Sequence, residues 1–119
     1  NGQGAGMLGL PGDISPPSRF VKMAFMLHYS YQPDTASDAL NLSQHIMNNV
    51  DIPLGVAREK NNGTDSNDIT QWTVFKDITH KIFYYHTYGD LTLRFVDLNK
   101  IDFSEKAKHP TIFRWRGLR

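Results

Sequence analysis

The sequence contains no cysteine, and this absence removes several kinds of chemistry from its 119 residues. A disulfide scaffold, a cysteine-ligated zinc site and a cysteine nucleophile all need a thiol, which the chain does not have. The absence does not separate cytoplasmic from exported proteins, since both kinds can lack cysteine. What it excludes is catalysis by a thiol that belongs to this chain.

A large net charge and a long apolar run are absent as well. The net charge is +1 and the pI is about 8.2, too little for the electrostatic attraction by which proteins hold nucleic acids. No apolar run approaches the roughly 20 residues of a membrane-spanning helix. We therefore expect neither a nucleic-acid partner nor a membrane span.

Basic residues near the C-terminus are interpreted as a solvated end, with a membrane-surface or nucleic-acid arm as the alternative. They are Lys106, Lys108, Arg114, Arg116 and Arg119.

The composition is that of a globular protein, with 39% hydrophobic and 21% charged residues. Aromatic residues cluster between Trp72 and Phe103, and this clustering favours strands, whose pleated surface accommodates flat rings. The chain starts at Asn1 rather than at methionine, so we expect it to have been cut from a longer protein. We interpret residues 1–119 as one domain or a piece of one.

A first helix is predicted where Ser15 precedes two prolines. Ser15 can cap this helix, and Pro16 suits its first turn because the missing N–H would be unpaired there anyway. The helix should end within residues 29–32, since Pro33 disfavours a helical conformation in the residue before it.

A second helix should start at Asp34 or Thr35, with Asp38 placed three residues after Thr35 as in a weak capping box. Residues 51–53, which include a proline, should end it. Its apolar residues recur at helical spacing and predict one buried stripe. The stripe comprises Ala36, Leu40, Met47 and Val50, with Ala39 and Ile46 beside it.

The second half of the chain changes to a period of two. Residues 54–69 are polar and are predicted to form a surface loop. Residues 70–76, 81–87 and 91–96 read as strands. The short turns between them force antiparallel neighbours, hence a meander. The predicted fold class is α+β, two helices followed by a three-stranded antiparallel meander. Because such a meander has two open edges, we expect further strands from the rest of the protein.

Two common site motifs are rejected from their context. Residues 4–9 match the glycine pattern of dinucleotide-binding loops, but no strand precedes them and Pro11 blocks a helix. The five histidines lack the spacing of metal ligands, so structural roles are expected for them and no metal or cofactor is predicted. They are His28, His45, His80, His86 and His109.

Hydrolase patterns built from carboxylates or serine are rejected too. Asp13 with Asp77, or Glu59 with Asp65, could be proposed as catalytic pairs. Nothing in the pattern places either pair on one face, which a glycosidase requires. The strained G-x-S-x-G turn of serine hydrolases does not occur.

One long motif does resemble a known family. Residues 9–20, GLPGDISPPSRF, resemble the GLPGD-x-[ST]-x-x-SRF stretch of the choloylglycine hydrolases. Other similar segments follow in the family's order and spacing, so the resemblance covers about residues 2–103. These segments are GQG at residues 2–4, NVDIPLGVAR at 49–58, TQWTV at 70–74, YYHTY at 84–88 and VDLNK at 96–100.

This resemblance implies an αββα sandwich, the N-terminal-nucleophile fold, in which residues 1–119 are the C-terminal portion of a single domain. It implies hydrolysis of linear carbon–nitrogen amide bonds, as in conjugated bile salts, penicillin V or related N-acyl compounds, without a cofactor. The family's nucleophile is an N-terminal cysteine whose own α-amino group, with an unperturbed pKa of about 7.7–8.0, acts as the base. That cysteine would lie on a missing N-terminal half or on a partner chain.

Of the family's catalytic residues, only the arginine of the SRF motif falls within this chain, at Arg19. In the family it lies beside the cysteine sulfur, where a permanent cation favours the thiolate. Taken alone, Arg19 would be interpreted as a surface arginine at a helix start. A cation near a helix N-terminus opposes the helix dipole unless an anion faces it. This local conflict is a physical hint of function, and we predict an active-site role for Arg19.

An alternative is a catalytically inactive structural or interaction domain that retains the fold. The segments at residues 51–55 and 70–74 are most similar to the Gram-negative branch of the family. On that basis we expect a periplasmic or secreted protein, with a cytoplasmic one as the alternative. We also expect a homo-oligomer.

Overall fold

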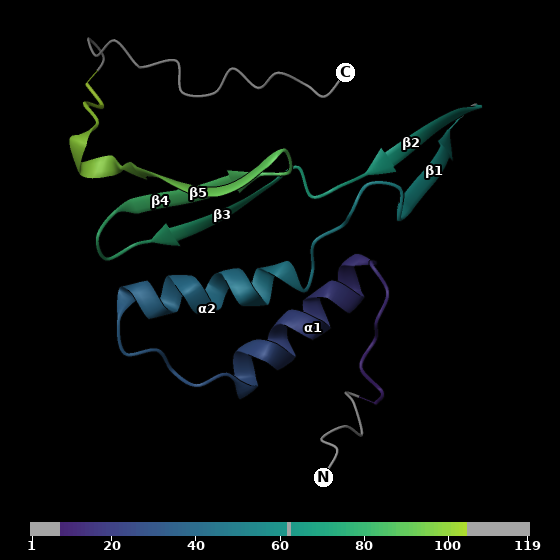
Figure 1. Cartoon of the computed structure of the whole chain (residues 1–119), viewed down its shortest axis with the longest axis horizontal. Coiled ribbons are helices and arrows are strands. Elements are labelled where there is room, and N and C mark those ends of the chain that lie inside the picture. The colour runs from purple at the N-terminus through teal and green to yellow at the C-terminus, as the bar shows by residue number, and fades with distance from the viewer. Residues whose placement is uncertain (1–7, 62, 105–119) are drawn as a thin grey trace.

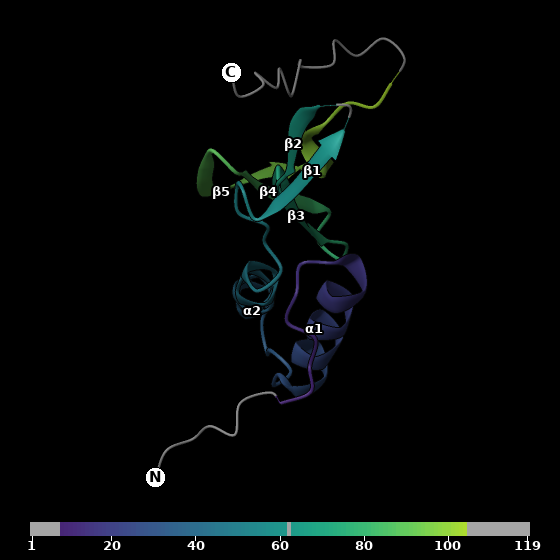
Figure 2. The same ribbon diagram turned by 90° about the vertical axis from the view of Figure 1, so that its right-hand side faces the viewer.

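The computed structural model describes residues 8–61 and 63–104 (Figure 1). Two helices are followed by a hairpin and then by a three-stranded meander. Figures 1 and 2 show the helices on one side of the meander, where α2 packs against β3. The elements are α1 (Pro16–Tyr29), α2 (Ala36–Asn48), β1 (Ala57–Asn61), β2 (Thr64–Asp68), β3 (Trp72–Asp77), β4 (Ile82–Thr87), β5 (Asp90–Asp97) and the 3-10 turn η1 (Leu98–Lys100).

Helix α1 has the predicted bounds but a different cap. Ser15 occupies the N-cap position in an extended conformation, yet its side chain accepts no bond from the helix backbone. Its hydroxyl instead donates to the Ser18 hydroxyl at 3.1 Å. The prediction that Ser15 caps the helix is therefore right in position and wrong in mechanism. Neither helix of the described part is long and apolar enough to cross a membrane.

Helix α2 starts where predicted, but fewer of its apolar side chains are buried than predicted. The Thr35 hydroxyl accepts the Asp38 backbone N–H at 3.1 Å and donates to the Asp38 carboxylate at 2.6 Å. At the other end, Ile46 and Val50 are only 5% and 2% exposed. Ala36 is exposed, contrary to prediction, because the first turn of α2 borders an open groove rather than a packed core.

The predicted loop at residues 54–69 is wrong, because most of it forms the β1–β2 hairpin. The two strands pair antiparallel, with Arg58 opposite Asn67 and Lys60 opposite Asp65. A two-residue loop joins them, in which Gly63 has φ +82°, a conformation that glycine adopts without strain. The dipeptide Asn-Gly at residues 62–63 is a hairpin signal. The hairpin was not predicted because the flanking residues are polar and lack the apolar alternation that indicates strands. The hairpin projects away from the helices and the meander (Figure 1).

The three predicted strands and their antiparallel order are confirmed. β4 lies between β3 and β5, with Thr73 opposite His86 and Tyr84 opposite Phe95. In the β3–β4 turn, the Asp77 carboxylate accepts the His80 backbone N–H at 2.9 Å. The α+β class, two helices followed by an antiparallel meander, is thereby confirmed.

The described part of the chain has a small core. Within residues 8–61 and 63–104, the buried hydrophobic side chains are Ile46 and Val50. Alternation along the strands turns one face of the meander toward α2 and the other away from it. Trp72, on the second face, is 58% exposed. We call this second face the outer face, formed by Trp72, Val74, Phe83, Tyr85 and Val96.

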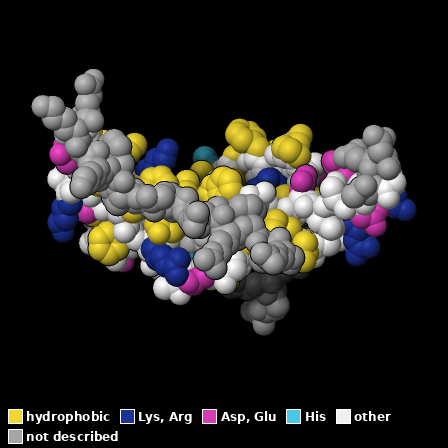
Figure 3. Space-filling view, turned by 90° about the horizontal axis from the view of Figure 1, so that it is seen from above, with side chains coloured by type: hydrophobic (Ala, Val, Ile, Leu, Met, Phe, Trp, Pro, Cys, Tyr) yellow, Lys and Arg dark blue, Asp and Glu magenta, His cyan; other side chains and the backbone are white. Residues whose placement is uncertain are grey.

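Figure 3 looks onto the molecule from above and shows hydrophobic side chains in several groups on this side. The outer face also carries Lys76, Thr87 and Arg94, which pair with Phe83, Trp72 and Tyr85. The outer face of the meander thus leaves Trp72 58% exposed and Val74 37% exposed in the described part of the chain.

The cap of α2 can be tested by substitution. Thr35→Ala removes the oxygen that accepts the Asp38 N–H, so we expect a loss of about 1 kcal/mol in the free energy of unfolding. Ser37→Ala is the control, since it removes an exposed hydroxyl from the same turn. Urea denaturation measures both. Equal midpoints for the two variants would show that the bond contributes nothing.

Candidate functional site

Arg19 lies in the first turn of α1 and reaches the chain that leaves α2. Its Nε donates to the Val50 carbonyl at 2.9 Å, while its backbone N–H donates to the Ser15 carbonyl at 3.0 Å. The side chain is half-buried and Val50 is almost fully buried. One turn later, Lys22 Nζ donates to the Asn49 carbonyl at 3.2 Å. Two cations of α1 thus meet the carbonyl-rich end of α2, where positive charge is favourable.

The terminal part of the Arg19 guanidinium is left available. Of its five N–H donors, one is used on Val50, and the two terminal nitrogens have no hydrogen-bond or ion-pair partner among the described residues. A planar fork of this kind binds anionic groups well. The geometry therefore presents a fixed cation to an anion that the described chain does not provide.

The carboxylate of Asp13 closes the turn in front of α1. Oδ1 accepts the Ser15 backbone N–H at 2.8 Å, and Oδ2 accepts the Ser18 hydroxyl at 2.6 Å. Hydrogen bonding by Ser15 and then by Ser18 lowers the pKa of Asp13 to about 2. Sequence reasoning considered Asp13 only as a rejected catalytic carboxylate. The carboxylate lies at the N-terminus of α1, where negative charge is favourable, and it bonds to Ser15 and Ser18 rather than to Arg19.

A second polar group lies on the face of the meander turned toward α2. His86 is 7% exposed, and its Nδ1 has no hydrogen-bond partner, nor has Oγ1 of the opposing Thr73. His86 and Asp51 both border a cavity of about 360 Å³. Asp51 directly follows Val50, whose carbonyl accepts the Arg19 bond. The expected structural role of His86 fits its burial on a strand.

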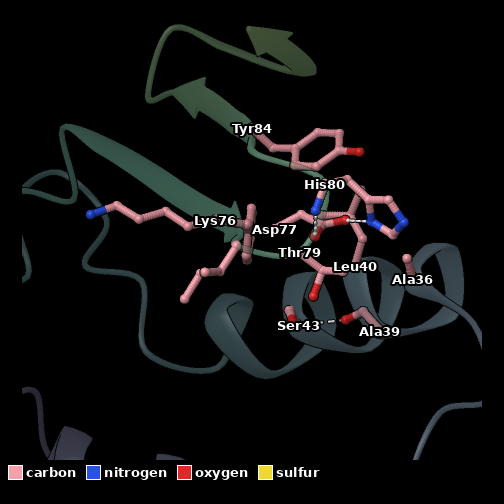
Figure 4. Close-up of a pocket in the computed structure, with 11 residues that line it drawn as sticks. Ala36, Ala39, Leu40, Ser43, Lys76, Asp77, Thr79, His80 and Tyr84 are labelled. Atoms are coloured by element: carbon pink, nitrogen blue, oxygen red, sulfur yellow. Dashed lines mark hydrogen bonds and ion pairs between the residues drawn. The ribbon is translucent and has the colours of Figure 1, made fainter. Parts of the chain in front are cut away.

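Another cavity, of about 440 Å³, lies at the other end of α2 (Figure 4). Figure 4 shows His80 and Tyr84 above the α2 turn that carries Leu40. His80 Nδ1 lies 2.7 Å from the Asp77 carboxylate, and the pKa of Asp77 is lowered, first by the backbone N–H of His80 and then by its ring. Because Arg19 does not border this cavity, the two features form no common site.

Other site types find no support in the described residues. No group of three or more His, Asp or Glu side chains in this part could hold a metal ion. Most of the glycine motif at residues 4–9 lies outside the described residues, and no helix begins within residues 8–15. The candidate site is therefore the Arg19 guanidinium, which is anchored to the Val50 carbonyl.

Comparison with known proteins shows which family the chain resembles. Residues 1–112 match the sequence profile of the linear amide C–N hydrolases, choloylglycine hydrolase family. A bile salt hydrolase/transferase of Clostridium perfringens is 37% identical over 99 residues, which are 83% of this chain and 29% of that protein. One of Lactiplantibacillus plantarum is 33% identical over 111 residues, 91% of this chain and 33% of that protein.

Solved structures agree with these sequence relatives. A mutant of the conjugated bile acid hydrolase of Clostridium perfringens superposes with a TM-score of 0.64 at 32% identity, covering 85% of this chain and 30% of that one. Penicillin V acylase of Agrobacterium tumefaciens gives a TM-score of 0.65 at 20% identity, over 82% and 30% of the two chains, and shows the shared fold. The chain spans about a third of the length of the curated relatives it matches.

The Asp13 turn predicts an acid-sensitive contribution to stability. An unfolded aspartate has a pKa of about 3.9, whereas folded Asp13 has one of about 2. The carboxylate therefore stabilises the fold above pH 4, and this contribution is lost as the pH falls from 4 through 2. The difference in melting temperature between the natural chain and Asp13→Asn should shrink over that range. A difference that stays constant with pH would contradict the assignment.

Proposed function

The chain belongs to the choloylglycine hydrolase family of linear amide C–N hydrolases, and from that premise we propose that it is the C-terminal part of an amide-cleaving enzyme. The nucleophile is a cysteine on the N-terminal part or on a partner chain, since this chain contains none. The observation that carries the proposal is the Arg19 fork, which is anchored through Nε and unpaired at its terminal nitrogens within the described residues.

In this proposal Arg19 lies beside the cysteine sulfur. A cation there lowers the pKa of the thiol and so raises the fraction of thiolate. The α-amino group of the cysteine takes the thiol proton, the thiolate attacks the amide carbon, and as the carbon–nitrogen bond breaks the ammonium passes that proton to the departing amine. Water then hydrolyses the thioester and releases the acid. Arg19 contributes the fixed charge and takes no proton, because guanidinium stays protonated.

The exposed outer face supports the proposal that a further part of the protein packs against the meander. Trp72 is 58% exposed and Val74 37% exposed on a meander that contacts α2 with its other face, through β3. Burying apolar area contributes roughly 25 cal/mol per Å², so covering this face would stabilise an assembled domain. We propose that the N-terminal part supplies the covering strands and the nucleophile together.

The proposed substrates are conjugated bile salts, penicillin V or related N-acyl compounds. Relatives named bile salt hydrolase/transferase and a structural neighbour named penicillin V acylase support this class. Turnover of glycine- and taurine-conjugated bile salts, compared with turnover of penicillin V, distinguishes the two. A periplasmic location and a homo-oligomeric state stay predictions.

The role of Arg19 can be tested in the full-length protein. Arg19→Ala should lower kcat/KM for amide hydrolysis by about 100-fold or more, because a fixed charge at the reacting atoms is lost. The matched control is Arg58→Ala, since Arg58 Nε also donates to a backbone carbonyl, that of Gly55, at 2.7 Å on the projecting hairpin. Arg58→Ala should keep full activity.

Three outcomes separate the alternatives. Full activity in Arg19→Ala would overturn the role of Arg19 in catalysis. An N-terminal part without cysteine, together with no turnover of any of the substrates, would instead indicate a catalytically inactive domain that retains the fold. Loss of activity in both arginine variants would point to a general loss of charge or stability rather than to the fork.

A further inference from the structure

We propose that Asp13 is a positioning residue for Arg19, which it fixes through Ser18 and the first turn of α1. The proposal rests on the active-site role proposed for Arg19 and extends it to a residue that does not touch the reacting atoms. Its basis is a set of hydrogen bonds in the first turn of α1. They join the Asp13 carboxylate to Ser15 and Ser18, and they join Ser15 to the backbone of Arg19.

The first step is the way the carboxylate is held. Each oxygen of Asp13 accepts one bond, from the Ser15 N–H at 2.8 Å and from the Ser18 hydroxyl at 2.6 Å. Ser15 in turn offers its carbonyl to the Arg19 N–H at 3.0 Å. Asp13 therefore binds Ser15, whose carbonyl accepts the Arg19 N–H, and Ser18, which immediately precedes Arg19.

The second step is burial. Ser18 is only 5% exposed, and its hydroxyl also accepts from the Ser15 hydroxyl at 3.1 Å. A buried hydroxyl with both a donor and an acceptor does not readily change partners, because breaking either bond would leave a buried polar atom unpaired at a cost in free energy. The first turn of α1 is thus locked in one orientation.

The third step is the second anchor. The head of Arg19 is fixed to Val50, and its backbone is fixed through Asp13, so the fork is held at both ends of the side chain. If the turn shifts, the terminal nitrogens move with it, and the Coulomb effect of the cation on a sulfur falls as the distance grows. Asp13 also supplies the negative charge that offsets a cation placed at a helix N-terminus.

The experiment uses the full-length protein and two matched aspartates. Asp13→Asn should lower kcat/KM by up to about 100-fold, as expected for displacement of a catalytic group. It should also move the pH dependence of alkylation of the cysteine by iodoacetamide to higher pH, because the thiol loses the nearby cation. The control is Asp38→Asn, since Asp38 accepts a hydroxyl at 2.6 Å at the start of α2. It should change neither quantity.

A double-mutant cycle asks whether Asp13 acts through Arg19. The apparent thiol pKa from alkylation should rise in Asp13→Asn and rise further in Arg19→Ala, and the double variant should equal Arg19→Ala. Additive shifts, or no shift in Asp13→Asn, would overturn the positioning role. If Asp13→Asn does not fold, Ser18→Ala takes its place in the cycle, because it removes only one of the two bonds to the carboxylate.

The same measurements separate this proposal from the one it rests on. An unchanged thiol pKa and full activity in Arg19→Ala would overturn the catalytic role of Arg19 and the positioning role with it. A strong effect of Arg19→Ala beside a normal Asp13→Asn variant would overturn the positioning role alone.

Discussion

One hydrogen bond, from Arg19 Nε to the Val50 carbonyl, decides where the only proposed catalytic side chain of this chain can point. It joins the first turn of α1 to the segment that leaves α2. Val50 is one of the most buried residues of the described part, so the anchor has little freedom to move. The bond occupies a single donor of the guanidinium and leaves the terminal fork free to meet an anion. The packing of the two helices and the chemistry proposed for the family member are thus connected through one side chain.

The rest of the described chain forms a scaffold with a small core of its own. Few apolar side chains are buried within it, and the outer face of the meander presents Trp72 and Val74 to solvent. The same chain spans about a third of its curated relatives and has no thiol. The proposed function accounts for both observations, because in it an N-terminal part or a partner chain covers the sheet and supplies the nucleophile.

Much of this architecture could be predicted from local rules. Pro16 and Thr35 marked the helix starts because proline and a capping hydroxyl suit those positions, and the period of two marked the strands. The β1–β2 hairpin was missed because its strands are polar on both faces and bury nothing. The role of Asp13 was missed because it depends on a turn that brings its carboxylate to Ser18, five residues ahead. Arg19 was found through a family motif, since its spacing alone favoured a surface arginine.

The most direct test of the central claim is a crystal structure of the full-length protein that locates the nucleophile relative to Arg19. The account predicts that the terminal nitrogens of Arg19 contact the cysteine sulfur while Nε still donates to the Val50 carbonyl. It would be contradicted if the guanidinium pointed into solvent, or if a carboxylate remote from the nucleophile occupied the fork.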